Sequence, residues 1–133
     1  MTDTPADTKK KILIIDDDTF LLDMYSLKFL ESNFDVSTAT SSADALAKLV
    51  GGFRPDIMLV DVVMPGMDGI QFLAALKEKA ITGIKHIVVL SNLGQKEDVE
   101  RGLANGAEDY IVKANFTPSE VVTKVRKIFE KDN

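Results

Sequence analysis

Short apolar runs alternate with amphipathic stretches along most of this chain. The apolar runs are rich in Ile, Val and Leu and lack strict polar alternation, as expected for strands buried on both faces. We predict five strands, at residues 11–16, 34–39, 56–61, 86–91 and 110–113. Strands that alternate with helices are typical of a parallel sheet covered on both sides. The pattern therefore predicts an α/β fold, with a doubly wound five-stranded parallel sheet in a three-layer sandwich.

Five stretches with helical periodicity lie between and after these strands, and each is expected to turn one apolar stripe toward the sheet. The stretch at 95–105 is the weakest, because Gly102 lowers its helix propensity. Asp18 or Thr19 is expected to cap the first helix. The segment Thr117-Pro118-Ser119-Glu120 predicts the start of the last helix, with a Thr cap, Pro in the first turn and a capping box. The expected inward positions are Phe20, Met24, Leu27 and Leu30; Leu46, Leu49 and Val50; Ile70, Leu73 and Leu76; Val99, Leu103 and Ala104; and Val121, Val125 and Ile128.

Length and composition indicate one globular domain. The chain has 133 residues, of which 45% are hydrophobic and 28% charged, and it has no cysteine. A domain of this size buries enough surface to fold without disulfides, and the absence of Cys excludes Cys-ligated metal sites. We expect residues 1–10 to be a disordered lead-in and residues 11–131 to form the domain.

Charge and hydropathy narrow the classes of partner. The net charge of −5 argues against direct binding of nucleic acid, which depends largely on clustered Lys and Arg. No apolar run approaches the about 18 residues that a membrane-spanning helix needs, and residues 1–11 lack an apolar signal segment. These features predict a cytoplasmic protein that does not bind membranes.

The predicted strands end in polar residues at one edge of the sheet. They are Asp16 and Asp17, Asp61, Ser91 and Lys113, and ligands of open parallel sheets bind at this carboxyl edge. Crowded carboxylates repel one another, which a hard cation relieves, and an all-oxygen site favours Mg²⁺. With a metal present, one carboxylate can attack phosphorus and form an acyl phosphate, while a cation and a hydroxyl stabilise the phosphoryl oxygens.

The segments ILIIDDD, DIMLVDVVMPGMDG, VVLSN and DYIVK resemble the receiver domains of bacterial response regulators. The four motifs occur in the order and spacing of that family, over about residues 11–131. The resemblance implies the flavodoxin-like, CheY-like (βα)5 fold and a signalling switch of a two-component phosphorelay. It implies these roles: Asp61 as phosphoacceptor; Asp16, Asp17, Asp61 and the backbone carbonyl of Val63 as Mg²⁺ ligands; Ser91 and Lys113 as phosphoryl-binding residues; and Tyr110 and Ser91 as switch residues.

The resemblance also implies partners. The phosphoryl donor is expected to be a sensor histidine kinase or a phosphotransfer protein. The output is expected to be a downstream protein or a self-dimer, bound through the fourth helix, fifth strand and fifth helix. The domain would then assist its own phosphorylation and dephosphorylation without acting as an enzyme. The alternative is a constitutive interaction module that ignores phosphorylation, although such modules usually lack the acceptor or a pocket acid, and this chain has both.

Other functions fit the sequence less well. A haloacid-dehalogenase-type phosphatase needs D-x-D-x-Thr or Val, but the fifth position from Asp16 is Phe20, and the third from Asp17 is Thr19. An acidic first loop would repel the phosphate of FMN, and no P-loop or GxGxxG motif is present. His86, the one histidine, begins the fourth strand at the end opposite the acidic residues, so a structural role is expected.

Two departures from the family pattern concern the site itself. Ala114 follows Lys113 where most relatives have a cis proline, and the high cost of a non-proline cis bond favours a trans bond with a rearranged loop. Val63, Leu93 and Asn92 occupy positions that tune dephosphorylation in the family. The apolar Val63 and Leu93 cannot position a hydrolytic water, and Asn92 narrows the access, which predicts a long-lived phosphorylated state.

Overall fold

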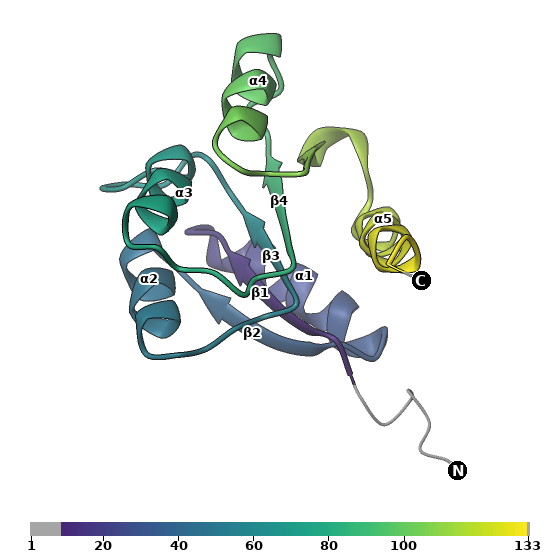
Figure 1. The fold of residues 1–133 in the computed structure, drawn as a ribbon. Helices are drawn as coiled ribbons and strands as arrows, with labels where there is room; N and C mark the ends of the chain where they lie inside the picture. Colours follow the sequence, from purple (N-terminus) through teal and green to yellow (C-terminus); the bar gives the residue numbers. More distant parts are fainter. Residues whose placement is uncertain (1–8, 133) are drawn as a thin grey trace.

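The structure is a computed structural model that describes residues 9–132, with five strands and five α-helices in alternation (Figure 1). Residues 1–8, on which most of the predicted lead-in falls, lie outside this range. The short segment Lys113–Asn115 forms a 3₁₀ turn. The elements are β1 (Lys11–Ile15), α1 (Thr19–Glu31), β2 (Asp35–Ala39), α2 (Ser42–Val50), β3 (Ile57–Val60), α3 (Gly69–Glu78), β4 (His86–Ser91), α4 (Lys96–Ala104), β5 (Asp109–Val112) and α5 (Pro118–Glu130).

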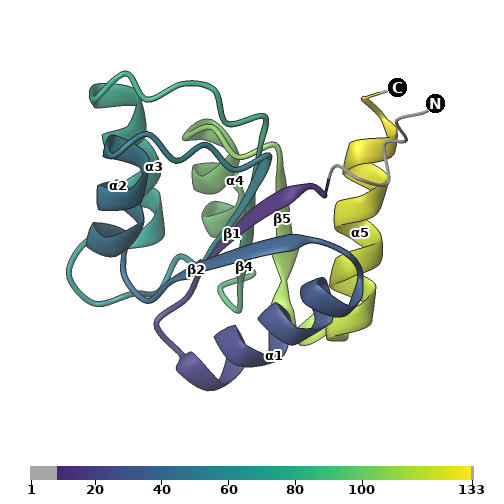
Figure 2. The same cartoon turned by 90° about the horizontal axis from the view of Figure 1, so that it is seen from below.

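The strands form one parallel sheet in the order β2-β1-β3-β4-β5. Helices α1 and α5 cover one face, and α2, α3 and α4 cover the other (Figure 2). Successive residues of β1 point into two separate cores, Ile12 and Ile14 toward α1 and α5, and Leu13 and Ile15 toward α2 and α3. This two-sided burial explains the unbroken apolar runs in the sequence. The predicted doubly wound fold is confirmed.

Side-chain caps begin the helices where the sequence predicts them. The Asp18 side chain accepts a hydrogen bond from the Leu21 amide (3.1 Å) and caps α1. At α5 the Thr117 hydroxyl accepts from the Glu120 amide, while the Glu120 carboxylate accepts from the Thr117 amide, with Pro118 in the first turn. The predicted capping box is therefore present.

The predicted inward face of α1 is wrong at three of its four positions, and the fourth, Met24, is partly buried against the core. Phe20 is 76% exposed, and Leu27 and Leu30 are also exposed, whereas Leu22, Tyr25 and Phe29 are buried. Apolar residues lie on all sides of this helix, so periodicity alone does not select the face that packs on the sheet. The exposed side leaves an apolar stripe on the surface of α1.

Two other helices differ in part from the prediction. Val50 of α2 and Leu103 and Ala104 of α4 are exposed, and Gly102 is the buried residue of α4. The expected faces of α3 and α5 are confirmed. The longest helices, α1 and α5, have 13 residues each, and no helix within residues 9–132 is long and apolar enough to cross a membrane.

Three strands are one or two residues shorter than predicted, and β5 is shifted by one residue toward the N-terminus. β1, β3 and β5 end before Asp16, Asp61 and Lys113, and β2 begins after Phe34. Each of these charged residues is therefore the first residue after its strand. There its side chain need not point to one face of the sheet or the other, as side chains within a strand do. This placement turns them toward one edge of the sheet.

Candidate functional site

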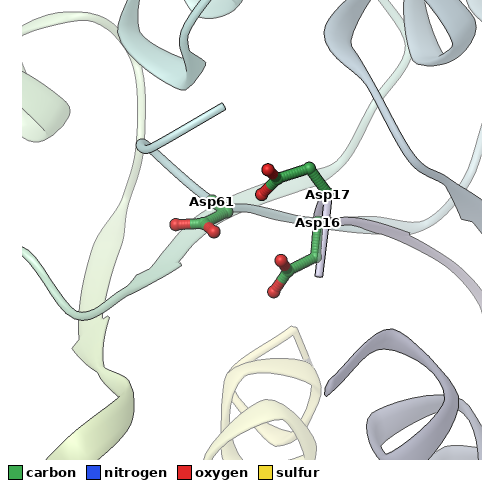
Figure 3. Close-up of side chains that lie close together, drawn as sticks. All are labelled: Asp16, Asp17 and Asp61. Carbon is green, nitrogen blue, oxygen red and sulfur yellow. The ribbon is translucent and has the colours of Figure 1, made fainter. Parts of the chain in front are cut away.

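Three carboxylates meet at the carboxyl edge of the sheet. Asp16 and Asp17 follow β1 and Asp61 follows β3, and these neighbouring strands pair Ile15 with Val60. Each of the three carboxylates offers an oxygen within 4.8 Å of the others (Figure 3). Asp16 and Asp61 are only 2% and 6% exposed, whereas Asp17 is exposed. The structure thus brings together the acidic residues that strand order predicts.

Local backbone contacts fix the positions of the two buried acidic residues, Asp16 and Asp61. Asp16 Oδ1 accepts a hydrogen bond from the Asp18 amide (2.9 Å) at the start of α1. Beside Asp61, α3 begins at Gly69, where a Cβ atom would lie 2.1 Å from the Asp61 carbonyl oxygen. Only glycine lets α3 begin this close to β3. The MPGMDG turn is therefore required to bring the α3 start against the acidic edge.

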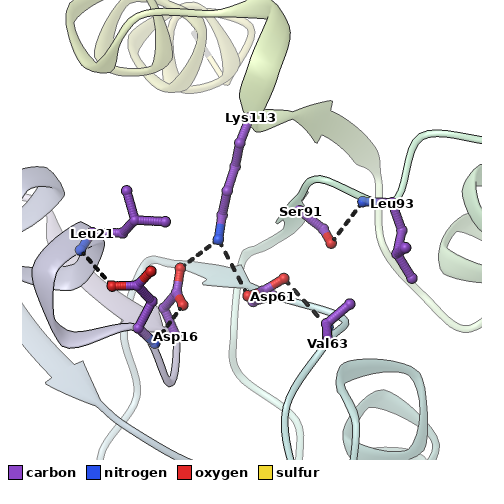
Figure 4. Close-up of polar contacts among 8 residues, drawn as sticks. Asp16, Leu21, Asp61, Val63, Ser91, Leu93 and Lys113 are labelled. Atoms are coloured by element: carbon purple, nitrogen blue, oxygen red, sulfur yellow. Dashed lines mark hydrogen bonds and ion pairs between the residues drawn. The ribbon is translucent and has the colours of Figure 1, made fainter.

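Lys113 extends from the end of β5 into the acidic cluster (Figure 4). Its Nζ lies 2.6 Å from Asp16 Oδ2 and 3.2 Å from Asp61 Oδ2, and its side chain is almost fully buried. No cis peptide bond occurs within residues 9–132, so Lys113 and Ala114 are joined by the trans bond that Ala114 favours. The 3₁₀ turn at Lys113–Asn115 leads the backbone away from the acidic cluster, while the Lys113 side chain still reaches both carboxylates.

The electrostatics leave negative charge in excess. Burial raises the pKa of Asp61, and the nearby Lys113 ammonium offsets this only in part. Burial opposes the Lys113 charge, but its hydrogen bond to Asp16 and the charges of Asp61 and Asp16 outweigh burial and raise the pKa of Lys113. One ammonium therefore faces three carboxylates. Such a site attracts a further cation.

Ser91 and Tyr110 are connected through a single residue of the β4–α4 loop. Ser91 ends β4, is fully buried, and its Oγ accepts a hydrogen bond from the Leu93 amide at 3.3 Å (Figure 4). The Tyr110 hydroxyl, from β5, donates to the Leu93 carbonyl. Burial raises the pKa of Tyr110, which keeps its hydroxyl protonated as a donor. The Leu93 backbone thus links the two predicted switch residues.

An open pocket of about 360 Å³ gives access to the three carboxylates, the Ser91 hydroxyl and the Lys113 ammonium. Val63, which is 57% exposed, and Asn92 lie at its wall, whereas Leu93 lies outside the lining and is 39% exposed. The lining offers carboxylate oxygens and no Cys or His, a donor set that suits Mg²⁺. The lining residues are Asp16, Asp17, Asp18, Leu21, Asp61, Val63, Ser91, Asn92 and Lys113.

Sequence reasoning missed a second charged cluster at the opposite edge of the sheet. His86 Nδ1 lies 2.5 Å from Glu108 Oε1, and its Nε2 lies 2.9 Å from Asp132 Oδ2. These partners are 22 and 46 residues away in the chain, so no local pattern announces them. The expected structural role of His86 agrees with these contacts, which tie the end of α5 to β4.

Comparison with known proteins identifies the family. Residues 12–126 match the family described as "Response regulator receiver domain", which is well over half of the chain. The chain belongs to this receiver family. The receiver is 37% identical to the DNA-binding response regulator MtrA of Mycobacterium tuberculosis over 118 residues, which cover 89% of this chain and 50% of MtrA. It is 32% identical over 122 residues to the phosphate regulon transcriptional regulatory protein PhoB of Escherichia coli, covering 92% and 52%. It thus spans about half the length of these curated relatives.

Solved structures share the receiver's fold. The chemotaxis protein CheY4 of Vibrio cholerae superposes with a TM-score of 0.81 at 28% identity, covering 90% of this chain and 98% of CheY4. A CheX–CheY–BeF3–Mg²⁺ complex from Borrelia burgdorferi matches with a TM-score of 0.80 at 29% identity, covering 90% and 89%. The predicted CheY-like (βα)5 architecture is confirmed.

Proposed function

We propose that this receiver is a phosphorylation-controlled signalling switch with Asp61 as its acceptor. The observation that carries the proposal is the meeting of three carboxylates, the Lys113 ammonium and the Ser91 hydroxyl around one open pocket. Asp61 is the central member, because it contacts Lys113 and directly follows β3, the strand between those that supply Asp16 and Ser91.

The reaction forms one bond and breaks one. A carboxylate oxygen of Asp61 attacks phosphorus, and the bond from phosphorus to the donor's leaving group breaks, so that Asp61 carries an acyl phosphate. The leaving group departs with its electron pair and takes up a proton. During the transfer, Lys113 and the Ser91 hydroxyl bind phosphoryl oxygens and stabilise the charge in the transition state. The donor is a phosphohistidine on a sensor kinase or a phosphotransfer protein.

Asp16, Asp17, Asp61 and the backbone carbonyl of Val63 would hold a Mg²⁺ ion. When bound, the ion neutralises the charge between the carboxylates and the incoming phosphoryl group. The all-oxygen lining and the excess of negative charge support this assignment. The similar CheY of Borrelia burgdorferi is described in a complex that contains Mg²⁺.

Phosphorylation with a small donor tests the acceptor. Incubation with acetyl phosphate and Mg²⁺ should add one phosphoryl group to the native protein, as measured by intact mass. Asp61→Asn should add none. Asp23→Asn, which changes an exposed carboxylate of α1, should behave as the native protein does. Full uptake by Asp61→Asn contradicts the acceptor assignment, and no uptake by the native protein favours the constitutive-module alternative.

The output of the switch is proposed to be protein binding through the face formed by α4, β5 and α5. A downstream protein or a second copy of the receiver binds there, and mixed surface charge orients the partner. We expect no direct binding of nucleic acid by this net-negative domain and no catalysis on diffusible substrates. Sedimentation and NMR shifts should change on phosphorylation, and unchanged values would contradict this output. The charged residues of the face include Lys96, Glu97, Glu100, Arg101, Asp109, Lys124, Arg126 and Lys127.

A further inference from the structure

The buried position of α4 is occupied by glycine. This helix has nine residues, and Gly102 is its buried residue. Glycine inside a helix is less favourable than alanine because it loses more backbone freedom on folding. Gly102 has an ordinary helical backbone and does not adopt the positive φ that would require glycine. The reason for glycine must therefore lie in what packs against it.

The Tyr110 ring fills the space that a side chain at residue 102 would need. A Cβ atom on Gly102 would lie 3.0 Å from Tyr110 Cδ2 and 3.2 Å from Tyr110 Cε2. It would also lie 3.4 Å from Val89 Cγ2 on β4, which is fully buried. The ring edge thus rests directly on the α4 backbone. A methyl group at residue 102 would push the ring, since the backbone and Val89 have no room to yield.

The same ring position supports the link to Ser91. The Tyr110 hydroxyl donates to the Leu93 carbonyl, and the Leu93 amide donates to Ser91 Oγ. A Cβ atom on Gly102 would require the ring to shift by a few tenths of an ångström, and the shift would move the hydroxyl that contacts the Leu93 carbonyl. The position of the ring against α4 is thus coupled to the loop that Ser91 contacts.

We propose that Gly102 is a positioning residue that keeps open the seat of Tyr110. The seat consists of the Gly102 backbone, Val89 and the Leu93 carbonyl. The seat holds the Tyr110 ring where it contacts both α4 and the Leu93 carbonyl, and the ring thereby connects α4 with Ser91. The signalling consequence rests on the proposed phosphorylation switch, but the seat itself is a property of the unphosphorylated protein and is tested separately.

A double-mutant cycle tests the seat without phosphorylation. In a Tyr110→Ala background, Gly102→Ala should raise the melting temperature by about 3 °C, because only the gain in helix propensity remains. In the native background, the same substitution should raise it less or lower it, because the methyl group displaces the ring. Equal shifts in both backgrounds would show no coupling and overturn the proposal.

Ring contacts provide the second readout. The chain has two tyrosines, so the Tyr25 ring serves as an internal reference in an NMR spectrum with labelled tyrosine. Gly102→Ala should weaken the contact between Tyr110 and the Val89 methyl groups. Gly51→Ala, a glycine with φ −72° at the end of α2, should preserve it. An unchanged Tyr110–Val89 contact in Gly102→Ala would overturn the seat.

Phosphorylation then tests the signalling consequence. Gly102→Ala should still take up phosphate on Asp61 at the native rate, because residue 102 lies outside the pocket lining. The change in Tyr110 ring signals on phosphorylation should be lost. A full native response of Tyr110 in this variant would overturn the consequence. Failure of the native protein to take up phosphate would refute the switch instead, and the cycle and ring contacts would still decide the seat.

Discussion

The two edges of the sheet both place carboxylates beside a cationic side chain, with opposite results. At the carboxyl edge, Asp16 and Asp61 share the ammonium of Lys113, and Asp17 adds a third carboxylate within 4.8 Å of theirs. At the amino edge, two carboxylates face one imidazole and one ammonium. Glu108 and Asp132 contact the His86 ring, and Lys85 Nζ lies 3.4 Å from Asp132.

The two edges differ in how well their charges are compensated. At the carboxyl edge, burial disfavours the ionised form of Asp61 and raises its pKa, and the Lys113 ammonium offsets this only in part. In the proposed switch, a bound cation would supply the missing positive charge. At the amino edge, burial opposes protonation of His86, but hydrogen bonds to Asp132 and Glu108 raise its pKa. The hydrogen bond from His86 in turn lowers the pKa of Asp132. The charges there balance when His86 is protonated, and the contacts of its ring tie the segment after α5 to β4.

Removal of the shared cation should produce the largest effect. Lys113→Met keeps the apolar stem but leaves two buried carboxylates unpaired, and we expect the free energy of unfolding to fall by about 3 kcal/mol without divalent ions. Urea titration measures this value, and millimolar Mg²⁺ should restore part of it. Lys127→Ala, at an exposed site of α5, should change stability by less than about 0.5 kcal/mol. Equal stability of Lys113→Met and the native protein would refute the charge imbalance.

Access of water to the carboxyl edge sets the second effect. Because Val63 and Leu93 cannot position a water, the phosphorylated state should last minutes to hours after the donor is removed. The double variant Val63→Asn with Leu93→Glu should decay up to about 10²-fold faster, as one added catalytic contact allows. Met67→Gln, an apolar-to-polar change at another surface position near the turn, serves as the control. Decay within seconds in the native protein, or no acceleration in the double variant, contradicts this explanation.

Neutralising Asp61 should have a smaller and stabilising effect. A carboxyl group whose pKa is raised by folding destabilises the folded state at pH values above that pKa, and the penalty fades as pH falls through it. Asp61→Asn should therefore increase the free energy of unfolding by about 1 kcal/mol at pH 7 without Mg²⁺. The gain should shrink at acidic pH, and Asp23→Asn should show none. A loss of stability in Asp61→Asn would mean that the carboxylate is well compensated.

The amino edge should show the smallest effect, with a pH dependence in the same direction, because folding raises the pKa of His86 as it does that of Asp61. A histidine whose pKa is raised by folding contributes stability that is complete below its unfolded pKa of about 6.5 and lost as pH rises through the folded value. Melting temperatures of the native protein should therefore fall in that range relative to His86→Gln. Solvent screens the partly exposed Glu108 and Asp132, so the change should be smaller than for Lys113→Met. Identical pH profiles of the two proteins would contradict a charged cluster.

The acidic edge was predictable because it follows from strand order. Parallel strands end at the same edge, so residues that follow β1, β3, β4 and β5 must converge whatever the helices do. Asp16, Asp61, Ser91 and Lys113 are placed by that rule. The caps at Asp18 and Thr117 were predictable for a different reason. Their hydrogen bonds span only three residues, so the local sequence is enough to predict them.

What the sequence did not predict depends on contacts between distant segments. Phe20 and Leu22 are equally good core candidates by periodicity, and only packing on the sheet and α5 buries Leu22. From the sequence alone, Gly102 only lowers the helix propensity of α4, and the structure shows that the Tyr110 ring packs against it. Likewise, the sequence shows no partner for His86, and the fold brings Asp132, which follows α5, to its ring.

The strand order also sets the sequence of events as the chain leaves the ribosome. β1, β2 and β3 are the first strands synthesised and are neighbours in the sheet, so Asp16, Asp17 and Asp61 emerge together in the first half of the chain. Lys113 comes from the last strand, at the far edge. The three carboxylates are thus synthesised before Lys113, the cation that contacts Asp16 and Asp61 in the folded site. Because Lys113 directly follows β5, the site is complete only when β5 has joined the sheet.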